Sequence, residues 1–248
     1  MAGMLHCETN RETSRETNRR ETTAPHFVPL NLARSTLVRK QSNLLTCEDI
    51  QLVHQIATNV RRNNGGDKSN EQNEHHNKSN KTCTFLNKTT PNMPTNPFRE
   101  LAKPVLGKLL RFAERSWKEE GWSKQGGALE HVKGPPGSPG GGEGGGVGCL
   151  SIRIIEAWRY EVDGHLDDDR HYDGGSVLTL VTALNDDFDG GAFRTFEEDG
   201  THKTHGLEKG DAVCFVSHKY HNVTRVERGV RNSLVIELWQ GGGVGLGR

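Results

Sequence analysis

The sequence predicts a mainly β fold: a double-stranded β-helix (jelly-roll) barrel that follows two helical regions. Residues 150–240 hold a series of short apolar segments, and turn signals such as Asn185-Asp-Asp, Gly190-Gly191 and Gly210 separate them. Short strands at this spacing indicate an all-β sandwich or barrel, and closure of the sheet leaves few exposed edges. The strand candidates are 150–160, 176–184, 191–196, 202–207, 211–217, 221–226 and 231–239.

The first helical region lies within 41–122. Thr46 is placed to cap a helix over 47–61, in which apolar residues such as Ile50 and Val53 recur at helical spacing. Acidic residues in its first turn and arginines in its last turn suit the helix dipole. We therefore expect a helix from about 47 to 61.

The second helical region covers 97–122. Pro104 should kink or delay this helix, and Gly121 should end it. Between the two regions, residues at about 63–96 form a low-complexity insertion rich in Asn, Lys, Thr, Ser and Gly. Within that insertion, 81–86 is a candidate for a short strand.

Three further segments are expected to stay outside the fold. Residues 1–40 are predicted to be a disordered tail, because repeats of Arg-Glu-Thr give balanced charge and few apolar side chains. Residues 123–149 form a loop rich in Gly and Pro that cannot hold regular structure. Residues 241–248 are predicted to be a flexible C-terminal tail.

Composition limits the partners of the protein. Its 248 residues carry 32 basic and 32 acidic side chains, with a mean hydropathy of −0.73. Zero formal net charge gives no electrostatic attraction to nucleic acid or to an anionic membrane. No apolar run approaches the roughly 20 residues of a membrane span, and the start lacks the apolar region of a secretory signal. Because five scattered cysteines without C-x-x-C spacing suit reduced thiols, we expect a cytoplasmic protein.

A candidate metal site lies at the start of the barrel. His171 and Asp173 are two residues apart, directly before the apolar run 177–184. Side chains two apart in an extended strand share a face, about 6.5 Å apart along the backbone. His221 follows the strand candidate 211–217. Two histidines and one carboxylate that leave coordination positions open are typical of non-haem iron(II) oxygenases.

Other residues compete for these roles. His165-Leu-Asp167 repeats the H-x-D pattern six residues earlier, and His218 also lies near the end of 211–217. The alternative without a site is a solvated acidic loop and an ordinary surface histidine. The residues alone leave this choice open.

Five motifs follow one another along the barrel region: His171-Tyr-Asp173, Asn185-Asp-Asp-Phe-Asp-Gly-Gly191, Gly210-Asp-Ala-Val-Cys-Phe215, His221-Asn-Val223 and Gly229-Val-Arg-Asn-Ser-Leu234. In this order, with ten residues from His221 to Arg231, they resemble the iron(II)- and 2-oxoglutarate-dependent dioxygenases, and within them the prolyl 4-hydroxylase-like branch. The family's register favours His171 and Asp173 over the earlier H-x-D pair. The ten-residue step favours His221 over His218.

The resemblance implies an iron(II) centre and a 2-oxoglutarate site. The metal ligands would be His171, Asp173 and His221.

Arg231 would bind the distal carboxylate of 2-oxoglutarate, because a guanidinium fork offers a carboxylate two parallel hydrogen bonds. Ser233 would add a hydroxyl contact to the cosubstrate, and Tyr160 would either contact the cosubstrate as well or serve only as a core tyrosine. Many relatives carry a tyrosine where this chain has Ala183. That departure removes one possible cosubstrate contact.

The implied reaction is hydroxylation of a C–H bond with release of succinate and carbon dioxide. It consumes O2, and its substrate would be a prolyl or other peptidyl side chain, or a small molecule. L-ascorbate commonly keeps such iron reduced. In this family, helices before the barrel pack on its outer face and support the sheet.

Two other functions compete: a non-catalytic jelly-roll protein that binds metal and partners, and a zinc site. Zinc sites more often bring a fourth protein ligand or a general-base glutamate, and neither is evident here.

Overall fold

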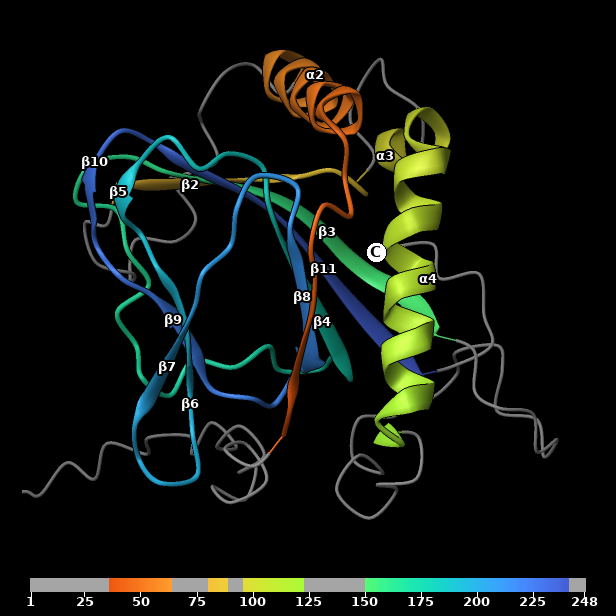
Figure 1. The fold of residues 1–248 in the computed structure, drawn as a ribbon. Coiled ribbons are helices and arrows are strands. Elements are labelled where there is room, and N and C mark those ends of the chain that lie inside the picture. Colours follow the sequence, from red (N-terminus) through yellow and green to blue (C-terminus); the bar gives the residue numbers. More distant parts are fainter. Residues whose placement is uncertain (1–35, 64–79, 89–95, 123–149, 241–248) are drawn as a thin grey trace, which may run out of the picture.

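The structure, a computed structural model, describes residues 36–63, 80–88, 96–122 and 150–240. Within these ranges, antiparallel strands form a six-stranded large sheet in the order β1-β8-β4-β11-β3-β2, and two small sheets, β7-β6-β9 and β10-β5 (Figure 1). The strands are β1 (Val38–Gln41), β2 (Lys81–Phe85), β3 (Leu150–Tyr160), β4 (Leu178–Ala183), β5 (Asp189–Gly190), β6 (Phe193–Phe196), β7 (His202–His205), β8 (Ala212–Val216), β9 (His221–Val223), β10 (Val226–Arg228) and β11 (Arg231–Gln240). The helices are α2 (Cys47–Asn63), α3 (Pro97–Leu101) and α4 (Lys103–Glu119).

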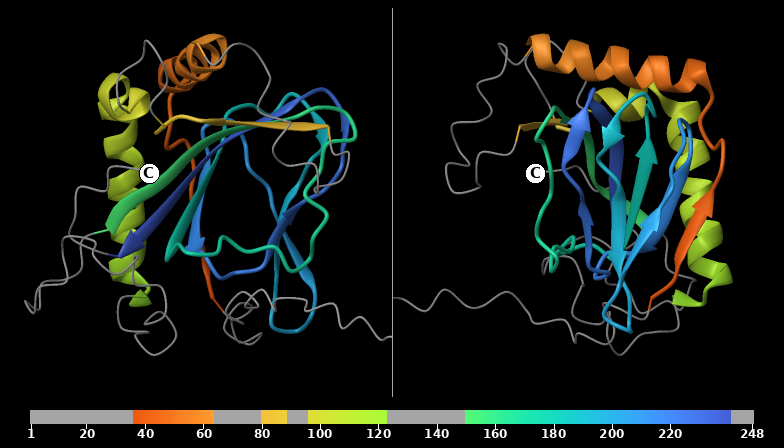
Figure 2. Two further views of the ribbon diagram at one scale, coloured as in Figure 1. Left: turned by 180° about the vertical axis from the view of Figure 1, so that it is seen from behind. Right: turned by 60° about the vertical axis from the view of Figure 1, so that its left-hand side comes forward.

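The two faces of the large sheet bury different sets of side chains. Leu180 and Cys214 point to the outer face and pack in one cluster with apolar residues of α2 and α4. Val181 and Val213, the next residues along the same strands, point inward and pack with Phe193 of the small sheet. This alternation follows from the two-residue period of a β-strand. The inner faces of the large and small sheets thus enclose the barrel interior (Figure 2).

The helices cover the outer face, in agreement with their expected supporting role. α4 packs against β4 and β8, and α2 packs against β2 and α3. The Thr46 hydroxyl accepts a hydrogen bond from the Asp49 amide at 3.3 Å, and the Asp49 carboxylate accepts one from the Thr46 amide at 2.9 Å. This reciprocal cap explains why α2 begins where the sequence predicted.

Pro104 delays the second helix, as predicted. The chain forms the short helix α3, leaves helical geometry at Ala102, and restarts as α4 with Pro104 in its first turn. Proline is tolerated there because the first amides of a helix have no partner within the helix. Gly121 follows the helix with a φ of +64°, the left-handed conformation in which helices commonly end.

The strand predictions hold with two corrections. The segment 221–226 is not one strand: β9 pairs with β6, whereas β10 pairs with β5. The tail assigned to 1–40 is wrong at its end, because Val38–Gln41 forms β1 and pairs with β8. The predicted tail and loop segments 1–35, 64–79, 89–95, 123–149 and 241–248 lie outside the described residues. No helix in the described part is both long and apolar enough to span a membrane.

We expect that removing residues 1–40 destabilises the domain relative to removing residues 1–35. β1 covers the edge of β8, and Lys40 pairs with Asp211 at 2.8 Å. Loss of this ladder and of the buried Thr36 should cost about 2–4 kcal/mol. For a domain of this size, that is a fall of about 5–15 °C in the melting midpoint. Thermal denaturation followed by circular dichroism measures it, and equal midpoints for the two truncations would show that β1 is dispensable.

Candidate metal and cosubstrate site

The loop between β3 and β4 carries the predicted H-x-D pair. His171 and Asp173 lie outside any regular strand, so the expected extended strand does not form there. The His171 carbonyl instead accepts from the His221 amide at 3.0 Å, and the Asp173 amide donates to the Ser217 carbonyl at 2.9 Å. Hydrogen bonds therefore tie this loop to both ends of the β8–β9 connection.

The structure brings the three predicted metal ligands together. Nε2 of His171 lies 3.3 Å from Oδ1 of Asp173, and Nε2 of His221 lies 3.7 Å from Oδ2 of Asp173. One ligand atom from each residue lies within 4.8 Å of the others, and no other such group occurs in the described ranges. Nitrogen and carboxylate ligands lie about 2.0–2.2 Å from a divalent transition metal, so atoms at these separations can share one ion.

Further hydrogen bonds fix the direction of these donors. Thr179 Oγ1 donates to Oδ2 of Asp173 at 2.7 Å and lies 2.8 Å from Oγ of Ser217. Nδ1 of His221 lies 3.0 Å from the carbonyl oxygen of Lys219. Because a carbonyl only accepts, Nδ1 carries the proton and Nε2 presents its lone pair to the cluster.

The charges of the cluster suit metal binding. Burial raises the pKa of Asp173, but the imidazoles of His221 and His171 and the Thr179 hydroxyl outweigh burial and lower that pKa overall. Burial lowers the pKa of His221, although Asp173 opposes the shift. An ionised carboxylate beside a neutral imidazole is the protonation state that metal ligands need. Three such ligands leave room for a keto acid and O2.

The competing residues lie outside this cluster. His165 is half-buried, with Nδ1 2.7 Å from the Asp163 carbonyl, and Asp167 is exposed. His218 lies in the turn after β8, and the centre of its buried ring lies 6.1 Å from the centre of the Tyr172 ring. None of these competitors belongs to the metal-capable group.

Arg231, Ser233 and Tyr160 meet on the inner face of the large sheet. Nη1 of Arg231 donates to Oγ of Ser233 at 3.0 Å, and its guanidinium carbon lies 5.3 Å from the centre of the Tyr160 ring. Arg231 is only 4% exposed, and it forms no ion pair with a carboxylate in the described part of the chain. Burial lowers the pKa of Arg231 and raises that of Tyr160 to about 12. A buried guanidinium without a counter-charge is costly, so this position favours an anionic ligand.

Several polar residues of the site could not be read from the sequence. Lys219 is fully buried, and its Nζ lies 3.0 Å from Oε2 of Glu197. Nothing in the sequence indicates that Lys219 pairs with Glu197. The role of Thr179 was only weakly indicated, by a hydroxyl at an inward position of an apolar strand. Ala183 pairs with Ser233 across β4 and β11, so the departure from the family pattern falls beside the predicted cosubstrate contacts.

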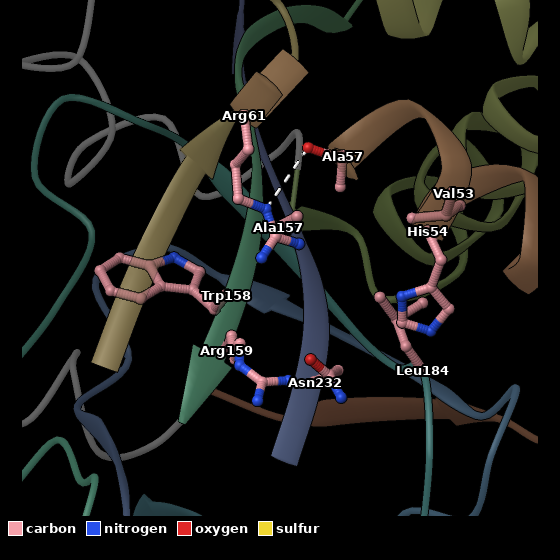
Figure 3. Close-up of a pocket in the computed structure, with 9 residues that line it drawn as sticks. All are labelled: Val53, His54, Ala57, Arg61, Ala157, Trp158, Arg159, Leu184 and Asn232. Atoms are coloured by element: carbon pink, nitrogen blue, oxygen red, sulfur yellow. Dashed lines mark hydrogen bonds between the residues drawn. The ribbon is translucent and has the colours of Figure 1, made fainter. Parts of the chain in front are cut away.

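A small pocket lies apart from this site, between α2 and the neighbouring strands β3 and β11 (Figure 3). It contains no metal-capable cluster and none of the cosubstrate residues. We therefore do not associate it with the chemistry. Its lining residues are Val53, His54, Ala57, Arg61, Ala157, Trp158, Arg159, Leu184 and Asn232.

Solved structures share this architecture. An oxidoreductase of the 2OG-Fe(II) oxygenase family from Burkholderia pseudomallei superposes with a TM-score of 0.53 and 15% identity, over 86% of this chain and 88% of that chain. AviO1 from Streptomyces viridochromogenes Tue57 superposes with a TM-score of 0.50 and 14% identity, over 88% of this chain and 97% of that chain. A prolyl-4-hydroxylase from Pseudomonas putida superposes with a TM-score of 0.46 and 16% identity, over 83% of this chain and 93% of that chain. At such identities the first two establish the fold alone, which confirms the predicted jelly roll.

Sequence comparison assigns a family to one segment of the chain. No curated protein sequence is significantly similar to this chain. Residues 155–239, however, match the 2OG-Fe(II) oxygenase superfamily, and this segment includes the whole metal cluster and Arg231. Residues 155–239 are therefore a domain of the 2OG-Fe(II) oxygenase superfamily, whose name refers to 2-oxoglutarate and iron(II).

Proposed function

We propose that the domain hydroxylates a C–H bond of a peptidyl side chain, with prolyl residues as the first candidates, and releases succinate and carbon dioxide. The observation that carries the proposal is a His-Asp-His donor set in the same barrel as a buried arginine without a carboxylate partner. One group suits the metal and the other suits an anionic cosubstrate. A barrel that served only as a scaffold would need neither.

The metal ligands in this proposal are His171, Asp173 and His221. When bound, iron(II) supplies the activation of O2 and the open positions for the keto acid. Thr179 keeps the Asp173 carboxylate turned toward the cluster, and the Lys219 carbonyl keeps His221 in the tautomer that can bind metal.

Arg231 receives the distal carboxylate of 2-oxoglutarate in this proposal. Its guanidinium donates to the Ser233 hydroxyl and lies 5.3 Å from the centre of the Tyr160 ring, and both contacts hold its position. Because the site is buried, water competes little with the charge-assisted hydrogen bonds. The cosubstrate would therefore bind in one orientation, with its keto-acid end toward the metal.

The peptidyl substrate, L-ascorbate as reductant and a cytoplasmic location are finer parts of the proposal. The order of the motifs around His171, His221 and Arg231 supports the first two through their similarity to the prolyl 4-hydroxylase-like branch. The scattered cysteines support a reducing compartment.

We expect succinate formation from 2-oxoglutarate to require iron(II) and O2, and a suitable peptide to raise it above the uncoupled level seen without peptide. The experiment compares a panel of proline-containing peptides with matched peptides in which alanine replaces proline, with and without ascorbate. Mass spectrometry of the peptides should show a gain of one oxygen atom. If no peptide raises succinate above the uncoupled level, the peptidyl assignment is wrong. If the iron-loaded protein also fails to bind 2-oxoglutarate, the enzymatic assignment fails as well.

A further inference from the structure

The metal loop contains a flexible joint directly after the carboxylate ligand. Gly174 and Gly175 follow Asp173, and Gly175 has a φ of +86°. Two successive glycines restrict the backbone least of all residue pairs. The direction of the Asp173 carboxylate therefore depends on what holds the far side of this joint, where Ser176 is fully buried.

Ser176 is held by an arginine from β3 and a glutamate from β11. Oε2 of Glu237 accepts hydrogen bonds from Oγ of Ser176 and from Nη1 of Arg153, each at 2.5 Å. Nη1 of Arg153 also donates to Oγ of Ser176 at 3.1 Å. The same guanidinium lies against Gly175, where an added Cβ would meet its Nη2 at 3.2 Å. These three side chains, Arg153, Ser176 and Glu237, are called the clamp below.

A β-bulge places Arg153 within reach of Glu237. Glu237 pairs with Ile154 and the next residue of β11 pairs with Ile152, so Arg153 has no partner on β11. Asn87 satisfies the backbone at this bulge, since its side chain donates to the Arg153 carbonyl and accepts from the Ile155 amide, both at 3.1 Å. Bulges commonly redirect a side chain near a functional site.

The clamp is connected to the carboxylate ligand by two routes. Along the chain, the Ser176 amide donates to the Asp173 carbonyl at 3.4 Å. Across the sheet, Glu237 pairs with Thr179, whose hydroxyl donates to Asp173 at 2.7 Å. We propose that Arg153, Ser176 and Glu237 are positioning residues that hold the Gly174-Gly175 joint, so that Asp173 meets the metal in one orientation. This inference rests on the proposed metal site.

The test measures cobalt(II) binding by the full-length protein. Ser176→Ala removes the hydroxyl at the centre of the clamp, and Glu237→Ala removes the shared acceptor. Each is expected to weaken cobalt binding by about tenfold or more, the range found for outer partners of metal ligands. Each should also change the visible absorption spectrum of the bound cobalt, which reports ligand geometry. Glu237→Gln keeps an acceptor oxygen, so its affinity for cobalt should lie between those of Glu237→Ala and the unchanged protein.

A matched control is Glu119→Gln. It breaks the exposed ion pair, 2.6 Å long, between Glu119 of α4 and Arg39 of β1. Cobalt affinity and the spectrum of the bound cobalt should not change. Wild-type affinity and spectrum in Ser176→Ala and Glu237→Ala would overturn the clamp, and so would a lower melting midpoint of the metal-free protein as their only effect. Absence of cobalt binding in the unchanged protein would instead overturn the metal site itself.

Discussion

Replacing Arg231 with leucine is expected to raise the dissociation constant for 2-oxoglutarate by about 30-fold or more while metal binding stays intact. The arginine is buried, forms no ion pair with a described carboxylate, and is held by Ser233 and Tyr160. Loss of one partner of a desolvated, charge-assisted pair costs on the order of 2–5 kcal/mol, and 2 kcal/mol corresponds to about 30-fold in affinity. Isothermal titration of 2-oxoglutarate into the metal-loaded protein gives the constant.

Two further variants sharpen this test. The dissociation constant of Arg231→Lys for 2-oxoglutarate should lie between those of Arg231→Leu and the unchanged protein, since an ammonium keeps the charge but loses the planar fork. Arg228→Leu is the matched control, because Arg228 is exposed and pairs with Asp189 on the protein surface. Unchanged 2-oxoglutarate affinity in a folded Arg231→Leu protein would show that another residue binds the distal carboxylate.

Alanine at His171, Asp173 or His221 is expected to abolish stoichiometric iron(II) binding. Only three protein ligands are available in this cluster, so each variant leaves two. The loss should exceed the roughly 10–100-fold that follows removal of an outer partner. Metal content after anaerobic loading and gel filtration, determined by elemental analysis, measures the effect.

The controls for these variants are His165→Ala, Asp167→Ala and His218→Ala. All three residues lie outside the metal-capable group, so iron stoichiometry should not change. Metal loss in His165→Ala together with retention in His171→Ala would mean that the earlier H-x-D pair is the ligand pair.

Local patterns predicted the parts of the fold that local interactions determine. The period of apolar residues and the cap at Thr46 located α2, and Pro104 marked the break before α4. β1 was missed because its sequence, Val-Arg-Lys-Gln, has one apolar residue and takes its order from pairing with β8. The single strand expected over 221–226 divides because its two halves pair with different strands.

In the candidate site, too, some features could be predicted from the sequence, whereas others depend on contacts between distant strands. Residue types indicated candidate metal ligands, and the resemblance to the dioxygenase family favoured His171, Asp173 and His221 among them and indicated Arg231 for the cosubstrate. The clamp could not be predicted in this way. Arg153 and Glu237 lie 84 positions apart, and their contact depends on a bulge that appears only when β3 pairs with β11.

The most direct test of the central claim is a titration of 2-oxoglutarate into the iron(II)-loaded protein without O2, followed by visible absorbance. If the keto acid binds to iron held by the cluster, a metal-to-ligand charge-transfer band should grow and saturate at one equivalent. The band should not form in Asp173→Ala, and it should require a higher 2-oxoglutarate concentration in Arg231→Leu. A fully iron-loaded, folded protein that develops no band would contradict the assignment of this barrel as a 2-oxoglutarate-dependent dioxygenase site.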